Sequence, residues 1–149
     1  MIVREIMTTE VSFVTADTTI EDAIALMRKQ KVQTMPVVGP DRLFLGMFTV
    51  RLFLKKGLPA YIVSGDLPDV RFAPDLPKFR ETLDQMRTAA VSTVMDADHP
   101  TVVAGNSVLE CAALLVNPKQ RIRSIPVVGA ANHLIGIVTG WDIIKEVYR

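Results

Sequence analysis

The heptapeptide Gly136-Ile-Val-Thr-Gly-Trp-Asp142, near the end of the chain, decides the fold. An apolar run typical of a buried strand leads into it, and apolar residues resume beyond it at helical spacing. Thr139 therefore lies at a predicted helix N-cap, with Asp142 three residues later in the first turn. The pattern has two interpretations. It is an ordinary capping box, or a small surface where a carboxylate accepts from both hydroxyls of a ribose and free amides approach a nucleotide.

The chain contains this pattern twice, together with the residues that precede it. Pro36-Val-Val-Gly39 in the first half recurs as Pro126-Val-Val-Gly129 in the second. Gly46 and Thr49 recur in the same order as Gly136 and Thr139. A repeat that keeps its register over about fifty residues indicates two copies of one supersecondary unit, each too small to bury its apolar face alone.

Each copy is predicted to run strand, helix, strand, strand, helix. Thr19 and Ser107 are N-caps with an acid three residues on, so each opens a helix. The predicted strands are 12–15, 35–38 and 43–48 in the first copy and 101–103, 125–128 and 133–138 in the second, and the closing helices are 51–56 and 141–148. Between the copies, the Pro- and Gly-containing start of the connector is predicted to be irregular and 78–87 to be helical. That helix either packs on the pair or forms a lid or partner surface.

Composition narrows the function further. The 149 residues are 49% apolar and 22% charged with a net charge of +1, so a folded core is expected and neither a nucleic acid nor a membrane surface is an expected partner. No apolar run approaches the ~20 residues that span a bilayer, and residues 1–7 lack a signal-peptide core, which predicts a cytoplasmic protein. Cys111 lies on an apolar helix face. His99 and His133 lack metal-ligand spacing, and no catalytic motif is present, so we predict no metal site and no enzyme.

The duplicated unit, with its hydrophobic-Pro-Val-Val-Gly and Gly-x-x-Thr motifs, resembles a tandem pair of cystathionine beta-synthase (CBS) domains, the Bateman module. The resemblance implies an α/β (α+β) fold in which two βαββα repeats pack with pseudo-twofold symmetry. It divides the chain into repeat 1 (1–58), a connector insertion (59–88) and repeat 2 (89–149). It also implies homodimers and two clefts between the repeats, which commonly bind AMP, ADP, ATP or S-adenosylmethionine.

By this resemblance the two clefts differ. Gly136 to Asp142 matches the family's ribose-binding signature throughout, whereas the first copy has Leu52 in place of the acid, which also removes the capping-box return bond. The phosphate-contacting base three residues before the proline is Arg123 in the second copy, with Arg121 as a weaker candidate, and Gln33 in the first. We therefore predict one competent cleft, with Asp142, Thr139 and Arg123, and a second cleft that is empty or reduced.

The resemblance completes the predicted site with residues of the other copy. The adenine would lie against backbone groups and apolar walls formed by Val11, Ser12, Val32, Gln33 and Thr34, with Lys31 at the rim. Trp141 could stack on a base, pack on a dimer partner or narrow the pocket. The predicted function is a regulatory module that senses an adenosine-containing nucleotide and signals to a regulated protein. The alternative is a constitutive dimerisation or interaction module with no ligand.

Overall fold

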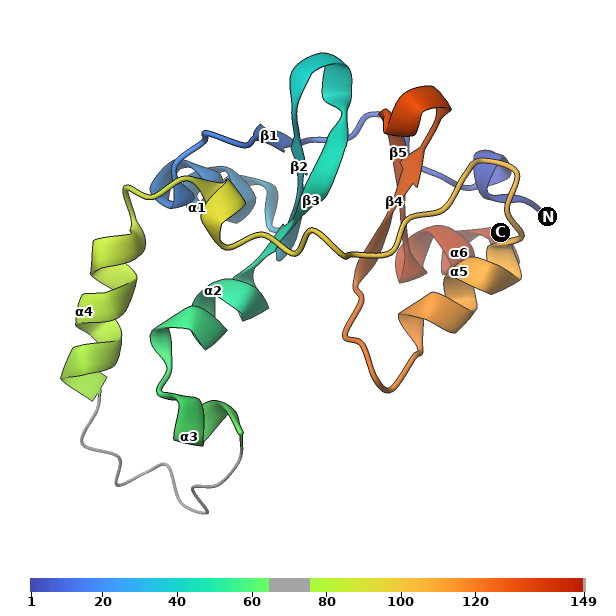
Figure 1. Cartoon of the computed structure of the whole chain (residues 1–149). Coiled ribbons are helices and arrows are strands. Elements are labelled where there is room, and N and C mark those ends of the chain that lie inside the picture. Colours follow the sequence, from blue (N-terminus) through green and yellow to red (C-terminus); the bar gives the residue numbers. More distant parts are fainter. Residues whose placement is uncertain (65–75, 149) are drawn as a thin grey trace.

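The computed structural model describes residues 1–64 and 76–148 and consists of two similar halves that lie side by side (Figure 1). The first half contains β1 (Val14–Thr15), α1 (Ile20–Gln30), β2 (Thr34–Val38), β3 (Phe44–Thr49) and α2 (Val50–Gly57). The second contains α5 (Val108–Leu115), β4 (Ser124–Val128), β5 (Leu134–Thr139) and α6 (Gly140–Val147). Short 3-10 turns precede or join these elements: η1 (Val3–Glu5), η2 (Pro40–Arg42), η4 (Val91–Thr93) and η5 (Ala130–Asn132). The predicted strand at 101–103 is reduced to a single parallel bridge between Val102 and Val127.

The register of the strands is the same in both halves. β2 pairs antiparallel with β3 and β4 pairs antiparallel with β5, and the equivalent pairs are Thr34 with Thr49 and Ser124 with Thr139. Both ladders shift register at the second valine of the Pro-Val-Val motif. Equivalent residues also meet each other: the Thr34 and Ser124 hydroxyls lie 2.8 Å apart, and Leu43 bridges His133. Contacts between equivalent positions lie on the axis that relates two copies, so the halves pack with local pseudo-twofold symmetry.

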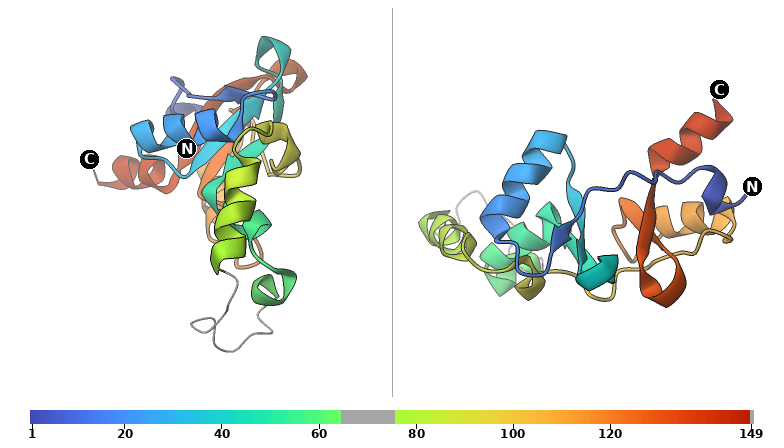
Figure 2. Two further views of the ribbon diagram at one scale, coloured as in Figure 1. Left: turned by 90° about the vertical axis from the view of Figure 1, so that its left-hand side faces the viewer. Right: turned by 90° about the horizontal axis from the view of Figure 1, so that it is seen from above.

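Each repeat contributes its first segment to the core of the other half. Val3 is fully buried in the core of the second half, and Val91 is fully buried in the core of the first. In the view from above in Figure 2, the N-terminal segment runs beside α5 before it crosses to the first half. The repeats that the sequence defines are therefore interlocked, since each core is completed by the other copy.

The motif glycines make this interlocking possible. Thr8 bridges Ile137 next to Gly136, and Asp96 bridges Met47 next to Gly46. A Cβ added at Gly136 would lie 2.9 Å from the Met7 sulfur, and one at Gly46 would lie 2.7 Å from the backbone oxygen of Asp96. A side chain at either position would push the incoming segment away, so both glycines serve a close approach of two chain segments.

The described part of the connector contains α3 (Ala60–Val63) and α4 (Leu76–Met86), the latter close to the predicted helix at 78–87. The rest of the segment predicted to be irregular, 65–75, lies outside the described residues. α4 runs beside α2 in the first half (Figure 1). A Cβ at Gly57 would lie 2.7 Å from a Leu83 methyl carbon, and Arg87 pairs with Glu21 of α1 at 2.7 Å. The connector helix therefore packs on the first half.

Candidate functional site

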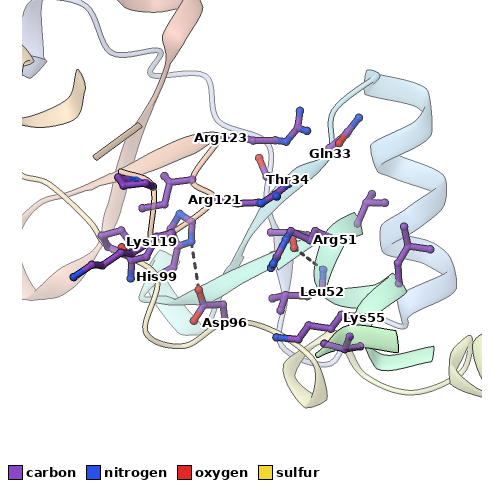
Figure 3. A pocket seen from close by; sticks show the side chains of 18 of the residues that line it. Gln33, Thr34, Arg51, Leu52, Lys55, Asp96, His99, Lys119, Arg121 and Arg123 are labelled. Carbon is purple, nitrogen blue, oxygen red and sulfur yellow. Dashed lines mark hydrogen bonds and ion pairs between the residues drawn. The ribbon is translucent and has the colours of Figure 1, made fainter. Parts of the chain in front are cut away.

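A cavity of about 870 Å³ opens between the two halves on the side of α2 (Figure 3). Its walls come from the end of β3 and α2, from residues 96–100, and from residues 118–123, which lead into β4. Thr49 and Leu52 of the first copy therefore face residues of the second copy. This volume lies within the range of small-molecule sites, which is about 300–1,000 Å³. The cleft that the sequence predicts to be empty or reduced is thus an open cavity.

The lining of this cavity is strongly cationic. Five basic side chains contribute to it: Arg51, Lys55, Lys119, Arg121 and Arg123. Among the described residues that line the cavity, Asp96 is the one with a carboxylate. Within residues 1–64 and 76–148, none of the five basic side chains has an ion-pair partner. Unpaired cations that line a recess with partly apolar walls create a positive potential there, so the cavity attracts anions.

His99 lines the cavity and contacts both Ser124 and Asp96. Its side chain is buried, and its Nε2 lies 2.9 Å from the backbone oxygen of Ser124 at the start of β4. Its Nδ1 lies 3.5 Å from Asp96 Oδ2, a contact that becomes an ion pair only when the imidazole is protonated. Asp96 also accepts from the backbone N–H of Asp98 at 3.0 Å. The imidazole therefore ties residues 96–100 to β4.

On the other side of the pseudo-twofold axis, Asp142 lies in the first turn of α6. Its Oδ2 accepts from the backbone N–H of Thr139 at 2.7 Å and from the Thr139 hydroxyl at 3.1 Å. Its Oδ1 accepts from the hydroxyl of Thr8 at 3.2 Å. The capping contact predicted from the sequence is therefore present. The carboxylate is half-buried and retains further lone pairs for a ligand, so both interpretations of the motif remain compatible with this geometry.

The equivalent position in the first copy has different chemistry. Thr49 caps α2 by accepting from the backbone N–H of Leu52 at 3.0 Å. Leucine has no acceptor, so the return bond to the Thr49 backbone is missing, as the sequence predicts. The threonine cap and the backbone are thus shared by the two copies, while the carboxylate belongs to α6 alone.

The structure locates the other predicted site residues as follows. Gln33, Thr34 and Arg123 line the cavity that contains Leu52. Within the described chain, the hydrogen-bond partners of the Asp142 side chain are Thr8 and Thr139. The assignment of Arg123 to the same cleft as Asp142 therefore stays a prediction. Sequence reasoning missed Thr8, because its contact depends on the exchange of the first segments.

The remaining predicted positions differ in burial. Gly136 is buried under Met7 and the backbone of Thr8. Val11 packs against the central core, while Ser12 and Val32 are exposed.

Among residues 1–64 and 76–148, no group of three or more histidine, cysteine, aspartate or glutamate side chains is placed to hold a metal ion. None of the helices in the described segments is long and apolar enough to cross a membrane. Burial raises the pKa of the Cys111 thiol, which lies in the core of the second half and is therefore unreactive, as expected from its apolar helix face.

One known protein-family model matches both halves of this chain. The model of the CBS domain matches residues 3–58 and again residues 91–149. The chain belongs to the CBS-domain family. The predicted tandem CBS pair, and its mixed helix and strand fold, are therefore confirmed.

Several known proteins are similar to this chain over almost all of its length. A choline transport ATP-binding protein, OpuBA of Bacillus subtilis, is 29% identical to this chain. The match covers 98% of this chain but only 30% of the length of OpuBA. CBSX2 of Arabidopsis thaliana, solved in complex with AMP, has a TM-score of 0.73 at 21% identity and matches 99% of this chain and 96% of its own. A CBS domain pair solved with 5′-methylthioadenosine and S-adenosyl-L-methionine has a TM-score of 0.68 at 18% identity and matches 99% and 96% of the two chains. At these identities the solved structures show the shared fold.

Proposed function

We propose that this CBS pair is a regulatory module that binds an adenosine-containing ligand beside Asp142 and signals its occupancy to a partner protein. The observation that carries the proposal is the half-buried Asp142 carboxylate at the start of α6, held by Thr139 from its own half and Thr8 from the exchanged segment. A carboxylate in this position accepts from vicinal hydroxyls of a ribose. The AMP and S-adenosylmethionine complexes of two similar CBS pairs support this class of ligand.

Symmetry supports the rest of this site. The cavity observed at Leu52 is lined by Thr49, Asp96 and His99, whose equivalents across the pseudo-twofold axis are Thr139, Thr8 and Val11. Val11, Ser12 and Val32 then provide the wall for the adenine. Gln33 lines the observed cavity beside Thr49 of its own half, so its equivalent, Arg123, is expected beside Thr139 as well. Arg123 would serve the phosphates, with Thr34 near the axis between the two sites.

The Thr8 contact offers a route for the signal. A ribose hydroxyl that binds Asp142 Oδ1 competes with the Thr8 hydroxyl for this oxygen. Thr8 belongs to the segment that completes the core of the second half. Ligand binding would therefore alter the attachment of the N-terminal segment, which a partner protein in the cytoplasm could detect.

Melting experiments test the proposal directly. A ligand at about 100 times its Kd stabilises a fold by roughly 2.7 kcal/mol, which corresponds to a Tm increase of roughly 5–10 °C for a chain of this size. We expect at least one of AMP, ADP, ATP and S-adenosylmethionine to produce such a shift. If no member of this panel at millimolar concentration moves the Tm by a degree, the proposal is rejected.

A second function, as a constitutive dimerisation module, is favoured by one face of α6. Trp141, Ile144 and Tyr148 follow the spacing of one helical face, and their exposed fractions are 71%, 46% and 82%. Leu109 on the neighbouring α5 is also exposed. We propose that a second copy covers these side chains, since identical apolar faces commonly pair in homodimers. Light scattering at micromolar concentration should give the dimer mass, and Trp141→Ser with Tyr148→Ser should give the monomer mass near 16.5 kDa.

A further inference from the structure

We propose that the groove between α1 and α4 is a docking site for an amphipathic helix of a partner protein, with carboxylates flanking the apolar face of that helix. The groove has a volume of about 510 Å³ and is bounded by α1, α2 and α4. It shares no described lining residue with the cavity between the two halves. The inference rests on the proposed function only in naming the partner as the regulated protein, and docking itself requires no nucleotide.

The two helices that wall the groove diverge from a closed corner. Arg87, directly after α4, lies 2.7 Å from Glu21 of α1 and 2.9 Å from Asp84 of α4. In the left view of Figure 2, α4 (yellow-green) runs steeply away from α1 (blue). Arg28 and Arg80 each lie about two helical turns from this corner, along α1 and α4 respectively. The groove is therefore a wedge that is closed at the ion pair and opens toward these two arginines.

The floor of the groove is apolar and continuous with the core of the first half. Ile24 and Phe53 pack against that core and remain only partly covered. Half-buried Leu83 and exposed Ala25 extend this apolar surface along α4 and α1. Because the described walls are helices, they offer no strand edge to an extended peptide. An apolar floor between helices instead accepts the apolar row of another helix, spaced at i, i+3 or i+4, and i+7.

The charges around the groove indicate the chemistry of the partner. Both carboxylates in the lining, Glu21 and Asp84, are engaged by Arg87. Arg28 and Arg80 are exposed, and within residues 1–64 and 76–148 neither has an ion-pair partner. The open end of the groove is therefore positively charged. Complementary charges at the rim of an interface select the partner and guide its approach, so the fitting helix carries acidic side chains there.

The groove belongs to the first half alone, because the connector supplies one of its walls. In the second half, α5 and α6 take the places of α1 and α2, and no described helix takes the place of α4. The positions equivalent to Glu21 and Arg28 are Leu109 and Val116, both exposed. The second half thus lacks the wall, the ion pair and the cation. Each protomer should consequently bind one partner helix, on the half that carries the connector.

The first experiment compares two synthetic peptides of about 18 residues, long enough to form a helix on binding. Both carry leucines along one helical face, flanked by glutamates in one peptide and by lysines in the other. Titration calorimetry with the full chain should show the glutamate peptide binding at least about tenfold more tightly than the lysine peptide, since only its charges complement the rim.

Charge reversal at the open end tests the assignment of the rim. Arg28→Glu combined with Arg80→Glu should weaken binding of the glutamate peptide by about tenfold or more and strengthen binding of the lysine peptide. Lys29→Glu combined with Lys78→Glu is the matched control. It makes the same charge change on the same two helices, at exposed positions outside the groove lining, and should weaken binding by no more than about threefold.

A substitution in the floor tests the apolar contact without changing charge. Ala25→Gln places a polar side chain in the groove and should weaken binding of the glutamate peptide by roughly fivefold. Ala113→Gln, at the equivalent exposed position of α5, is the control and should leave the affinity unchanged. Circular dichroism spectra would show that each variant is folded, as expected for exposed helix positions.

Four outcomes would overturn the inference. They are no binding of the glutamate peptide, equal binding of both peptides, equal losses in the Arg28/Arg80 and Lys29/Lys78 variants, or light scattering in which the Arg28/Arg80 variant turns a dimer into a monomer. The last result would make a second copy the occupant of the groove. Failure of the proposed function is distinguishable: the glutamate peptide then binds as described while no adenosine-containing ligand raises the Tm. A Tm increase without peptide binding would reject the docking site alone.

Discussion

The helices α2 and α6 occupy equivalent places in the two halves and have diverged in opposite ways. α2 is covered by α4, with Leu83 against Gly57, and carries Leu52 in its first turn. α6 has Asp142 at that position and exposes a row of apolar side chains. The strand register that leads into both helices is nevertheless the same. A shared backbone can therefore be preserved by a few glycine, threonine and proline positions, while a single first-turn residue changes the hydrogen-bond acceptors that each side of the molecule presents.

The largest effect in this comparison is expected at the paired motif glycines. Gly46→Ala brings a Cβ within 2.7 Å of a backbone oxygen, whereas Gly136→Ala meets the Met7 sulfur at 2.9 Å, on a side chain that can move. Overpacking typically costs about 1–3 kcal/mol. We expect Gly46→Ala to lose about 3 kcal/mol of unfolding free energy and Gly136→Ala about 1–2 kcal/mol, measured in urea. Equal losses of unfolding free energy would mean that the backbone of Asp96 moves away from residue 46 as easily as the Met7 side chain moves away from residue 136.

The second largest effect is expected on ligand affinity, when Asp142 and Leu52 in the first turns of α6 and α2 are replaced. Asp142→Asn should weaken binding of an adenosine-containing ligand by roughly 10–100-fold, because a charge-assisted hydrogen bond contributes roughly 1.5–3 kcal/mol. Leu52→Ala should leave the affinity for the same ligand nearly unchanged, since it removes no acceptor. Calorimetry on the apo proteins decides this. A response to Leu52→Ala without one to Asp142→Asn would mean that the two sides of the molecule have been assigned in reverse.

A smaller effect on stability is expected from the packing of α4 against α2. Leu83→Ala removes methyl groups that lie against the end of α2, and should lower the free energy of unfolding by about 1 kcal/mol, since Leu83 is half-buried and the loss of a fully buried leucine costs about 2–5 kcal/mol. Leu109→Ala, at an exposed position on α5, is the matched control in the other half and should be near neutral in the monomer. Thermal unfolding of both variants would show whether α4 stabilises the first half.

The smallest effect belongs to the ion pair between α4 and α1. Hydrogen bonds and charge attraction from Glu21, and then from Asp84, raise the pKa of Arg87, so the guanidinium stays charged throughout the accessible pH range. The pair is exposed, and salt screens exposed pairs. Arg87→Gln should therefore lower the Tm slightly at low salt and not measurably at high salt. A loss that persists at high salt would show that the arginine contributes packing as well.

Local sequence patterns predicted the elements well because their causes are local. Thr19 accepts from the backbone N–H of Asp22 and Ser107 from that of Leu109, and each helix begins one residue later, as the capping patterns predict. The Pro-Val-Val motifs likewise form the central strands β2 and β4. The family and the tandem fold followed from these elements and their duplication.

The arrangement of side chains across the axis could not be predicted in the same way. Periodicity shows that Val3 and Val91 are apolar positions, but it does not show which half buries them. The contact of Thr8 with Asp142, and the place of Arg123 in the cavity at Leu52, depend on that long-range choice. The sequence also showed the loss of an acid at Leu52, but not the recess with five cations around it.

The exchanged first segments also constrain how the chain reaches its native state. The first half cannot complete its core until Val91 and Val94 have been synthesised. Val3 in turn can be buried only after the second half has formed. Such distant contacts slow folding relative to a chain whose halves close independently. They also imply that two fragments divided within the connector would each carry a piece of the other's interior. The fragments would remain associated without a peptide bond between them, as a naturally split protein does.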